Sequence, residues 1–291
     1  MKLLSFKEEQ PRVGALVGGM VLDLNSARDF IPTTLSEILA RGLLATVQNI
    51  VDNASDLGRE HLRDIKSLSI YPPVLKPGKI ICVGLNYKSH AEEQDRQAPE
   101  RPIIFAKAPS ALAGPFDDVV VPAGVTHIDA EAELAVVIGR ECKAVEEEDA
   151  MDYVAGFMAL NDVTARKFQK DDGQWFRSKS FDTFAPCGPW LVTKDEIGDW
   201  QNLNVQQRLN GKTMQDGNTS EMIFPVAKLV SYISKGITLL PGDIISTGTP
   251  AGVGVFRNPR VFLEDGDVVE VEIARIGKIR NRVRIMQAEQ K

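Results

Sequence analysis

Two carboxylates that lie two positions apart open an otherwise apolar segment of the chain. The segment runs Asp129-Ala-Glu131-Ala-Glu133 and continues with five apolar residues to Ile138. Residues two apart in a β-strand project to the same face, so Glu131 and Glu133 would lie side by side. Two like charges there are costly unless a cation or a basic group offsets them. The pattern fits either a pair of metal ligands or two surface glutamates at a strand end.

A third carboxylate, Asp162, follows the apolar run 155–160 and precedes a helical pattern. Asp162, Arg166 and Gln169 are spaced i, i+4 and i+7, which would place them on one helix face with Asp162 as the N-cap. A cap and an ordinary ion pair would explain this pattern. Together with the two glutamates, the same residues could instead form a three-carboxylate Mg²⁺ site with open positions for substrate and water.

The cysteines and histidines argue against other metal sites. The chain has 3 Cys and 3 His, with neither a Cys-x-x-Cys motif nor a histidine pair at helical spacing. A disulfide scaffold and a zinc site are therefore poorly supported. Oxygen ligands favour Mg²⁺, Mn²⁺ or Ca²⁺.

Two further motifs could move protons. His90 and Glu93 are one helical turn apart, so Glu93 could orient the imidazole as a general base, although a lone histidine is more often structural. Lys179 lies between aromatic residues in WFRSKSF, where desolvation would lower its pKa. Surface lysines are far more common, so the spacing alone leaves the role of Lys179 open.

A glycine-rich segment, Thr247-Gly-Thr-Pro-Ala-Gly-Val-Gly254, follows a predicted strand. Closely spaced glycines let backbone N–H groups approach an anion. The segment has neither the P-loop Gly-Lys-Ser/Thr nor the dinucleotide-binding fingerprint. It could be a tight structural turn or a carboxylate-binding loop.

The elements that must position these residues read as a β-rich α+β fold. A hairpin over 13–24 and a helix from 33 to 50 predict a small N-terminal α/β module at 1–72, which ends at a proline-rich boundary. The main domain, 73–291, contains strands at 80–83, 133–138, 244–247, 268–274 and 279–285, and helices at 146–154, 164–169 and 226–234. The acidic cluster 146–149 would form the first turn of its helix.

Composition limits the possible functions. The chain has 291 residues, 43% hydrophobic, with a net charge of −6, which predicts one large or two unequal globular domains. We expect no nucleic-acid partner, because basic residues and aromatics do not form a stripe. No apolar run approaches the length of a membrane span, and the first apolar stretch is short for a signal peptide. A cytoplasmic protein is expected.

Taken together and in order, these motifs resemble the fumarylacetoacetate hydrolase superfamily. The resemblance rests on ICVGLNYKSHAEE, IIFAKAPSAL, EAELAVVIG, ALNDVTARKFQ, SKSFDTFAPCGPWLVT, LNGKTMQDGNT and LLPGDIISTGTPAGVGVF. It covers about 78–286, and the stretch from GVGVF through VFLEDGD most resembles the domain-containing protein 2 type of this family.

The resemblance implies a mixed β-sandwich roll, a homodimer and one divalent metal, Mg²⁺ or Mn²⁺, per subunit, without an organic cofactor. It implies metal ligands at Glu131, Glu133 and Asp162, a water-activating pair at His90 and Glu93, and an active-site lysine at Lys179. It also implies substrate contacts, which are Arg166, Gln169, Gly248, Thr249 and, less specifically, Lys107. The stretch Gln94 to Arg101 lengthens and charges the predicted lid.

The implied activity is the metal-dependent cleavage of a C–C bond in an acylpyruvate, a 2,4-dioxo acid, to pyruvate and a carboxylic acid. His90 would deprotonate the attacking water, and a metal-stabilised enolate would leave. Because enolate stabilisation is shared by several reactions, three alternatives stay open. These are oxaloacetate decarboxylation, oxaloacetate keto–enol tautomerisation, and isomerisation or hydration of 2-oxo-dienoates in aromatic catabolism. A non-catalytic protein that binds 2-oxo acids is a further, less favoured alternative.

Overall fold

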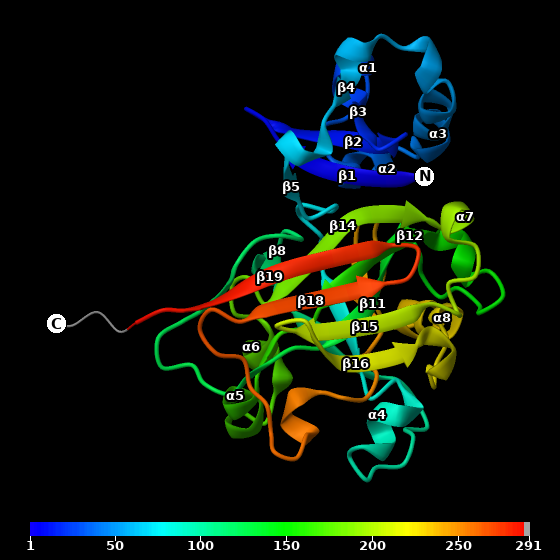
Figure 1. Cartoon of the computed structure of the whole chain (residues 1–291). Helices are drawn as coiled ribbons and strands as arrows, with labels where there is room; N and C mark the ends of the chain where they lie inside the picture. The colour runs from blue at the N-terminus through cyan, green and yellow to red at the C-terminus, as the bar shows by residue number, and fades with distance from the viewer. Residues whose placement is uncertain (288–291) are drawn as a thin grey trace.

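A computed structural model describes residues 1–287 as two packed β-sheets with short helices around them (Figure 1). The larger, mixed sheet has the strand order β4-β3-β2-β1-β14-β12-β11-β17-β6-β7, with β5 beside β1 and β8 beside β14. Its strands are β1 (Lys2–Lys7), β2 (Pro11–Val17), β3 (Met20–Asp23), β4 (Leu62–Arg63), β5 (Ser69–Tyr71), β6 (Ile80–Gly84), β7 (Ile103–Lys107), β8 (Leu112–Ala113), β11 (Ala132–Ile138), β12 (Val154–Asn161), β14 (Ala185–Thr193) and β17 (Ile244–Ser246). The predicted β-rich α+β class is confirmed.

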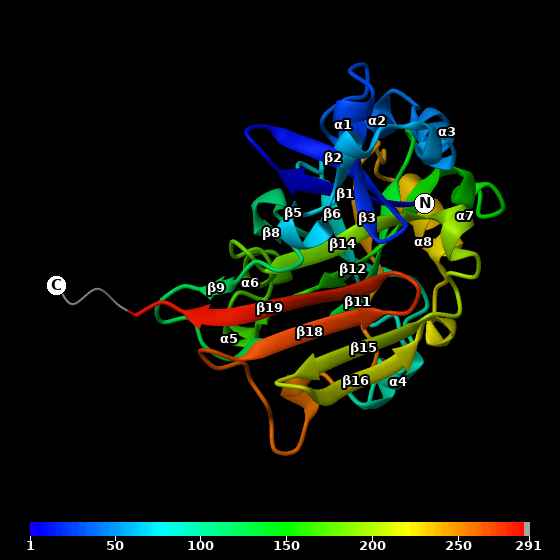
Figure 2. The same cartoon turned by 45° about the horizontal axis from the view of Figure 1, so that its top comes forward.

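The smaller sheet has the order β16-β15-β18-β19-β9 and lies as a layer over β11, β12 and β14 (Figures 1 and 2). Its strands are β9 (Val119–Val121), β15 (Asn204–Leu209), β16 (Lys212–Asn218), β18 (Val268–Ile273) and β19 (Gly277–Ile285); β10 (Ile128–Asp129) and β13 (Thr164–Ala165) form a separate pair. Alternate residues of β18 and β19 are buried, as expected when one face of a sheet covers a core.

The core explains why β11 and β12 are continuous apolar runs. Every residue of both strands is buried, because both faces of this part of the sheet are covered. Leu134 and Val136 join a cluster with Val271 of the smaller sheet. Ala135 and Val137, on the opposite face, join a cluster that extends into the N-terminal module.

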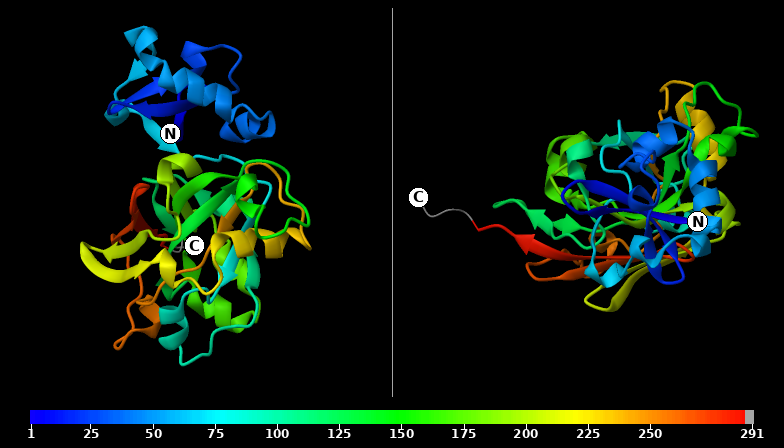
Figure 3. Two further views of the ribbon diagram at one scale, coloured as in Figure 1. Left: turned by 90° about the vertical axis from the view of Figure 1, so that its right-hand side faces the viewer. Right: turned by 90° about the horizontal axis from the view of Figure 1, so that it is seen from above.

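The N-terminal module stands at one end of the molecule, and its strands extend the larger sheet (Figure 3). β1 pairs with β14, with Leu3 opposite Leu191, and the amino group of Met1 donates to Thr193 Oγ1 at 2.8 Å. The predicted hairpin is present as β2 and β3. The division at residue 72 stays a prediction, and residues 288–291 of the predicted main domain lie outside the described part of the chain.

The helices are short. They are α1 (Leu24–Ala27), α2 (Leu35–Ala40), α3 (Leu44–Asp52), α4 (Lys88–Glu92), α5 (Arg166–Asp171), α6 (Trp175–Lys179), α7 (Lys194–Ile197) and α8 (Val226–Ser234). The single helix predicted from 33 to 50 is two helices, because Gly42 adopts a φ of +67° that ends α2. The helix predicted at 226–234 is present as α8, and within residues 1–287 no helix is both long and apolar enough to cross a membrane.

The α-helix predicted at 146–154, with an acidic first turn, is wrong. This segment is a turn followed by the 3₁₀ helix η5 (Ala150–Tyr153), and β12 begins at once after it. Two of its acidic side chains pair with lysines outside their own segment. Glu147 pairs with Lys228 at 3.4 Å, and Glu146 pairs with Lys235, next to the end of α8, at 3.5 Å.

Candidate active site

The candidate active site lies where the start of β11 meets the ends of β12 and β17. β11 runs antiparallel to both neighbours, and Ala132 lies opposite Asn161. Residues that begin β11 therefore lie beside those that follow β12. This register brings Glu131 and Glu133 next to Asp162, although about thirty positions of the chain separate them.

Glu131, Glu133 and Asp162 form a compact buried group, which we call the acidic triad. One carboxylate oxygen from each residue lies within 4.8 Å of the other two, and all three side chains are buried. The predicted placement of Glu131 and Glu133 beside each other is confirmed, and their burial excludes the solvent-facing strand end. Burial, together with the charges of Asp162 and Glu131, raises the pKa of Glu133 to about 8.

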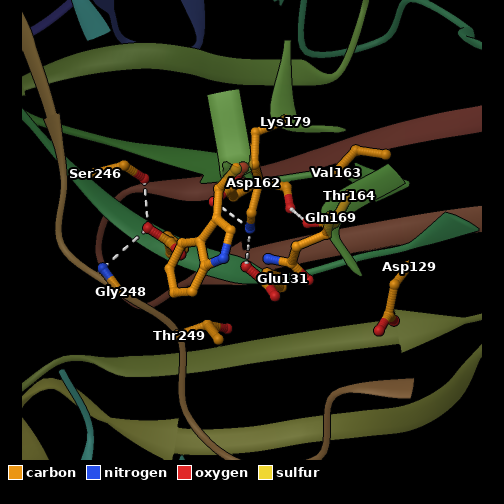
Figure 4. Close-up of polar contacts among 12 residues, drawn as sticks. Asp129, Glu131, Asp162, Val163, Thr164, Gln169, Lys179, Ser246, Gly248 and Thr249 are labelled. Atoms are coloured by element: carbon orange, nitrogen blue, oxygen red, sulfur yellow. Dashed lines mark hydrogen bonds and ion pairs between the residues drawn. The ribbon is translucent and has the colours of Figure 1, made fainter. Parts of the chain in front are cut away.

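Two buried lysines lie against the acidic triad. Lys179 Nζ lies 2.6 Å from Glu131 Oε2 and 2.7 Å from Asp162 Oδ2. Figure 4 shows Lys179 between these two carboxylates. Lys107 Nζ lies 2.6 Å from the other Asp162 oxygen and donates to the carbonyl of Val163. Lys107, predicted as a substrate contact, thus binds a carboxylate of the protein behind the triad.

The prediction that desolvation lowers the pKa of Lys179 is wrong. Lys179 is buried and lies 5.2 Å from the centre of the Phe105 ring, so its apolar surroundings are as expected. Burial alone would lower its pKa, but the charges of Asp162 and Glu131 outweigh burial and raise it. The lysine therefore acts as a cation and a hydrogen-bond donor.

The carboxylates at this site outnumber the cationic side chains, which favours the binding of a divalent cation. Four buried carboxylates, those of the acidic triad and of Asp129, face the side chains of Lys107, Lys179 and Arg166. Glu133 has no cationic partner among the described residues and instead accepts from Ser246 Oγ at 2.5 Å and the Gly248 N–H at 2.9 Å. A buried carboxylate with a raised pKa and two carboxylate neighbours is the environment that a cation with oxygen ligands stabilises. The residues present therefore fit Mg²⁺ or Mn²⁺.

Arg166 binds carboxylates other than the predicted one. The predicted cap and ion pair with Asp162 are wrong, because the short strand β13 separates the two residues and α5 begins at Arg166 itself. The guanidinium lies 2.9 Å from Asp129 and 2.5 Å from Glu131, and it also donates to Gln169 Oε1 at 3.0 Å. The predicted substrate contacts Arg166 and Gln169 thus lie together beside the triad.

Asp129 is a buried residue of this site that the sequence analysis did not assign. Its two oxygens accept the backbone N–H groups of Gly254 and Val255, each at 3.0 Å, in addition to Arg166. Burial raises its pKa. The signal was present in the sequence, since Asp129 continues the alternation of Glu131 and Glu133 by one step.

The glycine-rich loop (residues 247–254) binds carboxylates that belong to the protein itself. The N–H of Gly248 donates to Glu133 Oε2, and the N–H of Gly252 donates to Glu93 Oε2 at 2.8 Å. Gly248 has a φ of +97°, and a Cβ there would lie 2.8 Å from the Cβ of Asn86, so only glycine fits. The loop thus joins the acidic triad to the segment that carries the predicted catalytic pair.

Thr249 lines the cavity but uses its hydroxyl within the protein. It donates to the carbonyl of Ala132 at 2.8 Å and accepts from Gln215 Nε2 at 2.7 Å. Gln215 also accepts the N–H of Ala132 and so connects β16 to the start of β11. Gln215 lies within the LNGKTMQDGNT motif that supports the resemblance, but no role was predicted for it.

His90 and Glu93 form the predicted pair at the end of α4. His90 Nδ1 lies 2.5 Å from Glu93 Oε1, and His90 Nε2 lies 2.9 Å from the side-chain nitrogen of Gln94. Phe256 meets the His90 ring edge to face, with ring centres 5.8 Å apart. The helix is anchored at its start, where Ser89 Oγ donates to Glu221 at 3.0 Å.

A cavity of about 740 Å³ connects the pair to the acidic triad. Of the predicted site residues, seven line it, namely His90, Glu131, Glu133, Arg166, Gln169, Lys179 and Thr249. Lys107, Asp162, Glu93 and Gly248 lie behind the wall as partners of lining groups. Aromatic side chains that the sequence analysis did not assign also line the cavity: Phe105, Trp175, Phe256 and Phe262.

Three further cations line this cavity, and we call Arg96, Lys170 and Arg260 the mouth cations. All three are exposed, and none has an ion-pair partner among residues 1–287. The neighbouring Lys167, by contrast, is paired with Asp171 at 2.7 Å. The mouth of the cavity therefore carries uncompensated positive charge, while its base is acidic.

Known proteins of similar sequence identify the family to which this chain belongs. Residues 79–284 match the family described as fumarylacetoacetate (FAA) hydrolase C-terminal. The chain belongs to the fumarylacetoacetate hydrolase family. It is 43% identical to a rat protein, "Oxaloacetate tautomerase Fahd2a, mitochondrial", over 97% of this chain and 91% of the rat protein. A Dictyostelium discoideum protein, "Fumarylacetoacetate hydrolase domain-containing protein 2 homolog", is 41% identical over 95% of this chain and 94% of that protein, which confirms the resemblance to the domain-containing protein 2 type.

Solved structures of the fumarylacetoacetate hydrolase family share the fold. The hydrolase from Exiguobacterium antarcticum is 35% identical, with a TM-score of 0.85 over 98% of this chain and all of that one. The maleylpyruvate hydrolase of Sphingobium sp. SYK-6, in complex with manganese(II) and pyruvate, is 30% identical, with a TM-score of 0.80 over 99% of this chain and all of that one. Family membership and a buried acidic triad support an enzyme and a divalent metal, whereas C–C hydrolysis is not established by these likenesses.

Proposed function

We propose that this protein is a divalent-metal-dependent oxaloacetate keto–enol tautomerase. The observation that carries the proposal is the cavity itself, which combines an acidic triad in need of a cation, a His90–Glu93 pair and uncompensated positive charge at the mouth. This arrangement suits a small 2-oxo acid with two carboxylates. The name of the rat relative supports the same reaction, which is the alternative, not the main, expectation from the sequence.

The acidic triad would hold the metal. A bound Mg²⁺ or Mn²⁺ would stabilise the negative charge that develops when a 2-oxo acid loses a proton. The side chains of Lys179, Lys107 and Arg166 lie against these carboxylates and offset part of their negative charge. Their side chains hold the carboxylates in place before substrate arrives, so little reorganisation accompanies the reaction.

The His90–Glu93 pair would move the proton. His90 lines the cavity, and Glu93 orients the ring through Nδ1, which leaves Nε2 to act as a general base. His90 would take a proton from C3 of the keto form, and the electron pair would move toward the 2-oxo oxygen. Protonation of that oxygen completes the enol. The reverse sequence returns the keto form, and neither direction consumes water.

The mouth cations would attract and orient the second carboxylate of oxaloacetate. A cluster of like charges around a concave opening raises the local concentration of an oppositely charged substrate. Arg96, Lys170 and Arg260 have no protein carboxylate to bind in the described chain, so they are free to serve a ligand. Arg166, in contrast, is already held by Asp129 and Glu131.

The test is the rate at which enol-oxaloacetate loses its ultraviolet absorbance. We expect the purified protein with Mg²⁺ or Mn²⁺ to accelerate this loss over the same metal without protein, and excess EDTA to remove the acceleration. Pyruvate is measured in parallel, because its release at the same rate would indicate decarboxylation. Equal rates with and without protein would contradict the proposal.

Acylpyruvate hydrolysis, the main expectation from the sequence, is the second candidate. One observation favours it, because His90 and Glu93 are already paired as a water-activating base would require. Chelator-sensitive release of pyruvate from acetylpyruvate, faster than oxaloacetate tautomerisation, would select this candidate.

The homodimer stays a prediction. So does the cytoplasmic location, while the name of the rat relative places that protein in mitochondria.

A further inference from the structure

We propose that Gln94 is the residue that directs the His90–Glu93 pair toward proton transfer on the substrate and away from activation of water. The proposal rests on the proposed tautomerase function and deepens it. Gln94 lines the cavity next to His90, and its amide lies where a hydrolytic water would have to bind the base.

The orientation of His90 follows from its two partners. An ionised carboxylate only accepts hydrogen bonds, so the proton between Glu93 and His90 belongs to Nδ1. The other oxygen of Glu93 accepts the N–H of Gly252, which holds the carboxylate against the glycine-rich loop. In the neutral ring, Nε2 therefore carries the lone pair, and this nitrogen is the base.

That lone pair already has a donor. The side-chain nitrogen of Gln94 lies 2.9 Å from His90 Nε2, a normal hydrogen-bond distance for an amide N–H. A water that is to be deprotonated must donate its own O–H to the same nitrogen. Since one lone pair accepts one strong hydrogen bond, the amide and the water compete for a single position.

Among Glu93, His90 and Gln94, only the side chain of Gln94 is free to move. Ser89 and Glu93 hold α4 against Glu221 and the glycine-rich loop, and Phe256 packs against the His90 ring. Gln94 follows Glu93, the residue that caps the end of α4, and is only partly buried. Its side chain can therefore turn away without disturbing the core or the paired carboxylate.

Substrate and water differ in what they offer the displaced amide. A 2-oxo dicarboxylate brings carboxylate oxygens, and a hydrogen bond to an ionised acceptor is stronger than one to a neutral ring nitrogen. Water offers no comparable acceptor. A carboxylate of bound oxaloacetate can thus accept the Gln94 amide in place of His90, so that the C3 proton can reach Nε2. A lone water would have to break the Gln94–His90 hydrogen bond without offering the amide an equally strong acceptor.

The two reactions differ in atoms as well. In tautomerisation, the C3 proton passes to His90 Nε2, the electron pair of the C–H bond moves to the 2-oxo oxygen, and His90 returns the proton to that oxygen. In hydrolysis, a water proton passes to Nε2, the water oxygen bonds to the distal carbonyl carbon, and the C–C electron pair becomes the enolate. Only hydrolysis requires water at the position that Gln94 occupies.

The experiment compares Gln94→Ala and Gln94→Asn with the unmodified protein and with Gln97→Ala, an exposed glutamine of the same segment. Each protein, loaded with Mn²⁺, is assayed for enol-oxaloacetate tautomerisation and for pyruvate release from acetylpyruvate. Hydrolysis in H₂¹⁸O is checked by ¹⁸O in the acetate product. We expect both shortened side chains to raise the ratio of hydrolysis to tautomerisation about tenfold, roughly the net value of one hydrogen bond, while Gln97→Ala leaves the ratio unchanged.

The outcomes separate the two proposals. If the unmodified protein does not accelerate tautomerisation, the proposed function fails. If it does, and neither Gln94 variant changes the ratio, the role of Gln94 fails while the tautomerase stands. A purely structural role would lower both rates together and leave the ratio constant, which would also overturn the inference. The Asn variant keeps a polar amide and preserves the test if the Ala variant folds poorly.

Discussion

The inner wall of the cavity and its lid are built in different ways. The acidic triad stands at strand ends within the larger sheet and is buried, with each carboxylate held by buried donors. The lid consists of the five-residue helix α4 and residues 93–101. In it His90 and Ala91 are buried, and the other side chains are partly or fully exposed. The strands of the sheet hold the acidic triad, which stabilises charge, whereas a short helix carries His90, the base that determines which reaction follows. This difference explains how one family can share a charge-stabilising centre and differ in chemistry.

The strongest test of the inner wall is Glu133→Gln. Loss of one carboxylate of the triad should weaken Mn²⁺ binding and lower the tautomerisation rate by about 10³-fold, since charge stabilisation is usually the largest catalytic contribution. Metal binding is measured by calorimetry and the rate by enol absorbance. Glu148→Gln, at an exposed acid of the 146–149 turn, is the matched control and should behave like the unmodified protein.

A substitution in the lid should lower the rate without weakening metal binding. His90→Ala removes the base but leaves the triad intact, so we expect a rate loss of about 10²- to 10⁴-fold with unchanged Mn²⁺ affinity. His61→Ala, in the N-terminal module, serves as the control. If His90→Ala weakened metal binding as much as Glu133→Gln, the two regions would not be separable and the comparison above would be wrong.

The stability of the metal-free protein should depend on pH through Glu133. The pKa of Glu133, about 8 in the folded protein, lies above its usual value, so the folded state binds more protons than the unfolded state between about pH 5 and 8. Stability should therefore fall as pH rises through this window. We expect the Tm of the EDTA-treated protein to drop by about 3 °C or more relative to Glu133→Gln over the same range. Parallel Tm curves for the two proteins would contradict the assignment.

The smallest effect is expected at the mouth. Arg260→Ala removes one of three exposed cations, and exposed charges contribute modestly and are screened by salt. We expect the KM for oxaloacetate to rise about threefold at low ionic strength, with little change in kcat. Acetylpyruvate, which lacks the second carboxylate, should show a smaller change. An equal change for both substrates would argue against recognition of the second carboxylate.

Sequence reasoning succeeded where local geometry decides position. The alternation of a strand predicted that Glu131 and Glu133 lie together, and the turn of a helix predicted the His90–Glu93 contact. It failed where several segments compete for one residue. Helical spacing made an ion pair of Arg166 with Asp162 one of two explanations, yet Asp129 and Glu131 bind Arg166, because β10 and β13 pair beside them.

The sequence by itself determined the β-rich class, the strands that carry the carboxylates, and the family, because side-chain alternation and local motifs are properties of neighbouring residues. Only the tertiary structure decided that Arg166 binds Asp129 and Glu131, that Lys179 stays cationic, and that the Gln94 amide hydrogen-bonds His90. The physical reason is the same in each case. Strand register sets which distant residues meet, and a charge in a buried site depends on every charge around it.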